Sequence, residues 1–239
     1  MPERQILWQA LGTAALVAMA AVVGIAPYVY YLSRVRFAHL IGQQAPWRSP
    51  VELMRAELLS IGLVVLVAAL VGTLAARRYG LVGIGDRALV RQARSLLLFA
   101  APALGVLSYL LFGRALAARV PGIYPSSLGW ALGHALKGAL FDEVVARYGM
   151  MTILCGVVRN HHLANGLQAV FFTVQAVLGL SFFGVRPDLS SFFVANVAAT
   201  FLTHMVLGAV FAKYGLAAVM LFHLGVGIQY PLHVAMAIR

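Results

Sequence analysis

Charged side chains are scarce in this sequence of 239 residues. Only 10% of the residues are Asp, Glu, Lys or Arg, whereas 62% are hydrophobic, and the mean hydropathy is +0.89. A chain with so little polar surface cannot stay dissolved in water, which excludes an ordinary soluble globular protein. We therefore expect one integral-membrane domain over residues 1–239.

Cysteine is almost absent. Cys155 is the single cysteine of the sequence, so an internal disulfide is excluded, as is a cysteine cluster that could ligate zinc or iron–sulfur. We expect no metal and no thiol redox chemistry.

Acidic residues are also few, with seven Asp and Glu against 18 Lys and Arg, for a net charge of +11. The basic residues stand at the ends of apolar runs rather than in a patch on a polar surface, which argues against a nucleic-acid partner. Membrane lipids with anionic head groups are the expected partners, together with other membrane proteins. We expect the protein to reside in a bacterial inner (cytoplasmic) membrane.

Long apolar runs are what the sequence does contain. A helix needs about 20 mostly apolar residues to cross roughly 30 Å of hydrocarbon. These runs predict an all-α, polytopic transmembrane bundle with about seven spans (six to eight): 6–32, 54–76, 95–115, 127–157, 166–184, 190–212 and 215–237.

An acidic pair, Asp142 and Glu143, lies inside the fourth predicted span. A carboxylate deep in a bilayer costs several kcal/mol unless it is paired, protonated or hydrated, so such residues are functional candidates by default. Glu143 precedes Arg147 by four residues, which predicts an ion pair on one helix face. Asp142 points about 100° away and has no partner at that spacing. We expect Asp142 to be available to water, a proton or a metal.

Later spans add further polar groups, among them Gln175, His204 and His223. Carboxylates and imidazoles on separate helices can activate water or transfer protons. Single histidines in membrane helices are, however, more often hydrogen-bonded packing residues. A structural ion-pair network is therefore the alternative interpretation of the whole set.

Two ordered motifs resemble those of the CPBP or Abi family, which comprises CAAX prenyl endopeptidases and bacteriocin-processing intramembrane proteases. The stretch 141–149, FDEVVARYG, is similar to the family's first motif of two glutamates, three residues and an arginine. The run 201–223 is similar to its third motif at Gly208, Phe211, Tyr214, Gly215, Leu216 and His223. The resemblance covers about residues 95–239. It implies a water-activating first glutamate and an oxyanion stabilised by histidine and asparagine.

Three positions depart from the family pattern. Asp142 stands in place of the first glutamate and is one methylene shorter, and a shift of about 1 Å can lower a rate about a hundredfold. Gln175, four residues after Phe171, replaces the histidine of the second motif. Gly227 replaces the asparagine of the third motif. Glu143, Arg147 and His223 are retained, and His204 is a candidate replacement imidazole.

Three functions follow as hypotheses. The first is a family-like membrane protein that has lost proteolysis and serves as a scaffold or subunit of a membrane complex. The second is an active intramembrane endopeptidase that uses Asp142, with Gln175, His204 and His223, on prenylated or membrane-anchored peptides. The third is haem or chlorophyll ligation by histidines in small-residue helices, for which the candidates are His134, His204, His223 and His233.

Overall fold

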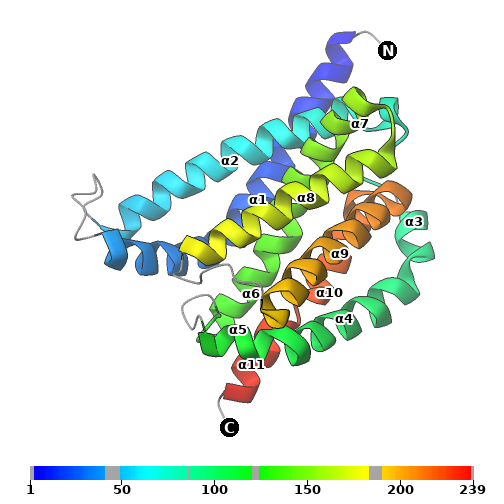
Figure 1. Ribbon diagram of the computed structural model, residues 1–239. Coiled ribbons are helices and arrows are strands. Elements are labelled where there is room, and N and C mark those ends of the chain that lie inside the picture. The colour runs from blue at the N-terminus through cyan, green and yellow to red at the C-terminus, as the bar shows by residue number, and fades with distance from the viewer. Residues whose placement is uncertain (1–2, 41–48, 86, 120–123, 183–189, 238–239) are drawn as a thin grey trace.

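The computed structural model describes residues 3–40, 49–85, 87–119, 124–182 and 190–237. Within these ranges the chain is helical and contains no strand (Figure 1). The elements are α1 Glu3–Leu40, α2 Pro50–Ala75, η2 Arg77–Tyr79, α3 Arg87–Gln92, η3 Leu96–Ala100, α4 Ala101–Ser108, η4 Tyr109–Gly113, α5 Arg114–Arg119, α6 Leu128–Leu136, η5 Lys137–Asp142, η6 Val144–Met151, α7 Thr152–Val158, α8 His161–Phe182, α9 Ser191–Tyr214, α10 Leu216–Val226 and α11 Gln229–Ala237.

Six helical segments of the described chain are long and apolar enough to cross a membrane, which confirms the all-α polytopic bundle. They are Arg4–Phe37, Pro50–Ala75, Leu96–Arg119, His161–Leu180, Phe192–Tyr214 and Leu216–Ala237. The remaining predicted span, 127–157, forms a continuous helix from Leu128 to Val158. This helix is not among the six apolar segments because it contains several charged side chains, including the acidic pair.

This charged helix, built from α6, η5, η6 and α7, lies at the centre of the bundle. It contacts α1, α2, α8, α9 and α10, and Figure 1 shows it passing between the α1–α2 pair and the helices of the C-terminal half. Lipid tails provide no hydrophobic force between helices, so close van der Waals packing must hold such a bundle together. The central helix is accordingly well packed, and Val144, Ala146 and Met151 are fully buried.

Small residues allow α1 and α2 to approach the central helix. On α1 the buried positions recur every three or four residues, at Ala10, Ala14, Ala18, Ala21, Ile25 and Val29. A Cβ on Gly133 would lie 2.8 Å from the backbone nitrogen of Tyr28. Gly149 similarly packs against Ala68 of α2, where a Cβ would lie 2.7 Å from the Ala68 methyl carbon. Backbones therefore pack almost directly against each other at these crossings.

The start of α10 is fixed by a loop from the first half of the chain. The backbone N–H of Leu216 donates to the carbonyl of Gly83 (2.8 Å), and the N–H of Ala217 donates to the carbonyl of Ile84 (2.9 Å). These bonds satisfy two of the donors that a helix N-terminus leaves unpaired. Gly215 adopts φ 85° and ψ 179°, and a Cβ on it would lie 2.8 Å from the Gly85 backbone. The backbone segments at Gly85 and Gly215 therefore cross in direct contact.

Candidate functional site

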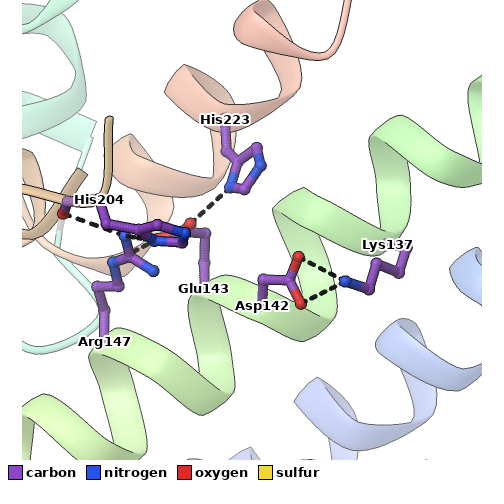
Figure 2. Close-up of polar contacts among 6 residues, drawn as sticks. All are labelled: Lys137, Asp142, Glu143, Arg147, His204 and His223. Carbon is purple, nitrogen blue, oxygen red and sulfur yellow. Dashed lines mark hydrogen bonds and ion pairs between the residues drawn. The ribbon is translucent and has the colours of Figure 1, made fainter. Parts of the chain in front are cut away.

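Asp142 and Glu143 leave the central helix in different directions and enter separate polar contacts. Figure 2 shows Asp142 directed toward Lys137 and Glu143 directed toward Arg147 and His223. The sequence predicted this divergence, since neighbouring residues on a helix are about 100° apart. The acidic pair is therefore two sites rather than one.

Glu143 is fully buried and is held by two basic side chains. Its Oε1 accepts a hydrogen bond from Nδ1 of His223, at 2.6 Å. Its Oε2 lies 3.3 Å from Nε of Arg147, which is also fully buried, so the predicted ion pair is present. The pair joins neighbouring turns of the central helix, while His223 belongs to α10. A buried carboxylate needs such partners, because an uncompensated charge in a low-dielectric interior is costly.

Arg147 extends the network to α9. Its Nη2 donates to Nδ1 of His204 at 2.8 Å and also lies 3.2 Å from the His204 backbone oxygen. The guanidinium lies 6.0 Å from the ring centroid of Phe172 on α8, and the His204 ring lies 5.4 Å from that ring. The structure thus brings Glu143, Arg147, His204 and His223 together across three helices. Since His204 Nδ1 accepts the bond, this imidazole is the neutral form with its proton on Nε2.

The expectation that Asp142 lacks a local partner is wrong. Lys137 places its Nζ 2.8 Å from both carboxylate oxygens of Asp142. Residues five apart lie about 140° apart on a regular α-helix and would not meet. Residues Lys137–Asp142 form a π-helical segment, η5, in which the hydrogen bonds run between residues five apart. The wider turn brings the two side chains to the same face.

A small polar cavity of about 140 Å³ lies beside these groups. Its wall includes Asp142, Lys137, His134, His223 and Tyr230. His223 reaches it because Gly138 has no side chain, and a Cβ there would lie 2.6 Å from Nε2 of His223. A cavity of this size and polarity can hold a few water molecules.

Gln175 lies outside this cluster. Its side chain is exposed and lines a different cavity, between α1 and α2.

Sequence reasoning missed two buried polar residues nearer the start of α8. Gln168 is fully buried, and neither atom of its amide has a hydrogen-bond partner among the described residues. Asn165 donates from Nδ2 to the backbone oxygen of Met205 at 2.9 Å. Asn165, Gln168 and Phe172 are three and four residues apart. This helical spacing, which places them on one face of α8, could have indicated their burial.

The four histidines considered for a cofactor differ in their contacts. His204 and His223 belong to the Glu143 network, and His233 Nδ1 lies 3.3 Å from the Tyr109 hydroxyl. His134 packs between Tyr28 and Tyr230, with ring centroids 4.9 Å and 4.0 Å away. Within the described ranges, the structure contains no cluster of three or more His, Cys, Asp or Glu side chains suited to a metal ion.

Fold and site together define the class of this protein as an integral membrane protein built as a polytopic helical bundle around a charged central helix. Comparison with protein-family models, with curated proteins and with solved structures finds no match to the chain.

Proposed function

We propose that this chain is a non-proteolytic protein resembling the CPBP family, which acts in a bacterial inner membrane as a scaffold or subunit of a membrane protein complex. The observation that carries the proposal is that internal basic side chains bind both carboxylates of the acidic pair. Lys137 contacts both oxygens of Asp142, and His223 with Arg147 occupies Glu143. Carboxylate oxygens that contact an internal cation are less available to bind and orient a water molecule.

The residues that match the family pattern have packing roles here, which also supports a scaffold. Gly208 packs against Asn165, and a Cβ on it would overlap the Asn165 side chain. Phe211 and Leu216 are buried, and Gly215 crosses Gly85. The catalytic positions that depart from the pattern are Asp142, Gln175 and Gly227. The packing residues of the pattern are retained while three of its catalytic positions have changed, which is the combination expected of a chain that keeps the fold without the proteolytic activity.

The cavity beside His223 favours one second candidate, the intramembrane endopeptidase. Asp142 and His223 share its wall, and Asp142 retains partial exposure of 18%. If Lys137 released Asp142, a water molecule in this cavity would lie near a base and an imidazole. Gln175 would take no part, since it lines another cavity.

Replacing Asp142 with asparagine separates the two functions. Asparagine keeps an acceptor for Lys137 but removes the charge that compensates its ammonium group, so we expect the free energy of unfolding to fall by about 1–3 kcal/mol while the chain still folds. The scaffold proposal predicts that, in a strain from which the gene is deleted, D142N and the wild type co-purify with the same amounts of partner proteins. The measurement is quantitative mass spectrometry of the complex extracted in mild detergent. It also predicts no cleavage of a prenylated or membrane-anchored peptide by either protein in liposomes.

An endopeptidase would behave differently in the same liposomes. The wild type would cleave the peptide, and D142N would lower the rate by about a hundredfold or more, the usual loss on removing a general base. That result would overturn the scaffold proposal.

A further inference from the structure

A second and larger cavity lies between α1, α2, η5 and α8, apart from the Glu143 network. Its volume is about 460 Å³, within the roughly 300–1,000 Å³ typical of ligand sites. Most of the wall is apolar and includes Ile25, Val29 and Leu53, all of which are buried. The wall is formed by α1, α2 and α8, which are candidate membrane spans, together with the central helix, so the cavity lies within reach of membrane lipids.

Among the described residues, the charges that line this cavity are balanced. Arg36 lies 2.7 Å from Oε1 of Glu57, whose second oxygen accepts a hydrogen bond from the Ser33 hydroxyl at 2.8 Å. Lys137, the other cation of the wall, is neutralised by Asp142. An ionised ligand would therefore bring an uncompensated charge into the span region, which is unfavourable.

Hydrogen-bond donors nevertheless remain. The ammonium group of Lys137 has three N–H donors, and the two oxygens of Asp142 account for two of them. The side chain is 30% exposed and lines both this cavity and the smaller one. Gln175 is exposed on the same wall and offers its amide N–H groups. The free groups thus suit oxygen acceptors such as the carbonyl of an ester.

We propose that this cavity binds an uncharged membrane lipid whose ester-bearing head accepts hydrogen bonds from Lys137 and Gln175, with its hydrocarbon chain along α1 and α2. The chemistry is that of an acylglycerol. The proposal does not rest on the scaffold function. The Glu143 network does not line the cavity, and Lys137, the residue that the two proposals share, can donate to a ligand while it contacts Asp142.

Binding of monooleoylglycerol to the full-length protein in mild detergent, followed by native mass spectrometry, tests the proposal. We expect saturable binding of one molecule per chain. Oleate at pH 8, which has the same chain with an ionised head, should bind at least tenfold more weakly. Oleate binding as tightly as monooleoylglycerol, or no saturable binding of the glyceride, would overturn the inference.

Two variants locate the site. Ala56→Trp places an indole in the cavity wall and should lower the affinity for monooleoylglycerol at least tenfold, whereas Val67→Trp, on the exposed side of the same helix, should leave it unchanged. Gln175→Leu should lower the affinity about five- to tenfold through the loss of one hydrogen bond. Its matched control is Val174→Leu, an exposed neighbour outside the wall.

These two variants can be interpreted independently. Should A56W elute as an aggregate, Q175L decides alone, since its side chain is exposed and its removal does not disturb packing. Wild-type affinity in a folded Q175L protein would contradict the proposed contacts of the head group.

Discussion

Replacing Arg147 with methionine should destabilise the folded chain by about 3–5 kcal/mol. The substitution fills a similar volume but leaves Glu143, which is fully buried, without its cation. It also removes the hydrogen bond that His204 Nδ1 accepts from Arg147. Removing one partner of a buried ion pair lowers the free energy of unfolding strongly because the other charge stays buried and uncompensated. Replacing both partners by apolar residues is often tolerated. The measurement is the unfolding midpoint in mixed detergent micelles, monitored by circular dichroism.

A double variant and a surface variant serve as controls. Glu143→Gln combined with R147M removes both charges and should recover at least half of the lost stability. Arg94→Met replaces an exposed arginine and should change stability by less than about 0.5 kcal/mol. An R147M protein as stable as R94M would show that the buried network does not hold the three helices together.

Replacing Gly215 with alanine should cost about 3 kcal/mol or more. With φ 85° and ψ 179°, Gly215 occupies a backbone region that is essentially restricted to glycine, where other residues cost about 1–3 kcal/mol. The added methyl would also meet the Gly85 backbone at 2.8 Å. Moving that backbone would disturb the hydrogen bonds that the Gly83 and Ile84 carbonyls accept from α10. The same unfolding measurement applies.

The matched control for G215A is Gly12→Ala. Gly12 lies inside α1, and a Cβ there would meet nothing within 4 Å. Alanine is favoured over glycine in a helix by about 0.5–1 kcal/mol, so G12A should be neutral or slightly stabilising. Equal stability of G215A and G12A would contradict the glycine crossing seen in the structure.

The membrane architecture could be predicted from the sequence because the bilayer imposes one requirement on every span. Apolar length alone located six of the helical segments. The Glu143–Arg147 pair was equally predictable, since a spacing of four is local to one helix face. Both predictions depend only on residues close together in the chain.

The contacts of Asp142 could not be predicted in the same way. Its partner, Lys137, is reached only because η5 departs from α-helical geometry, and nothing in a pattern of residue types signals that departure. The meeting of His204 and His223 with the central helix depends on how α9 and α10 pack, which is a long-range property. Gln175 illustrates the same limit, because a match to a motif position did not bring its side chain into the cluster.

The pairing of charges on the central helix has an electrical consequence. Lys137 with Asp142, and Arg147 with Glu143, give this helix two cations and two carboxylates, each within 3.3 Å of its opposite charge. A membrane potential acts on displaced net charge, at about 2.3 kcal/mol per elementary charge for every 100 mV. A movement that carries each pair as a unit therefore transports no net charge, and changes in membrane voltage should leave the position of the central helix unaltered.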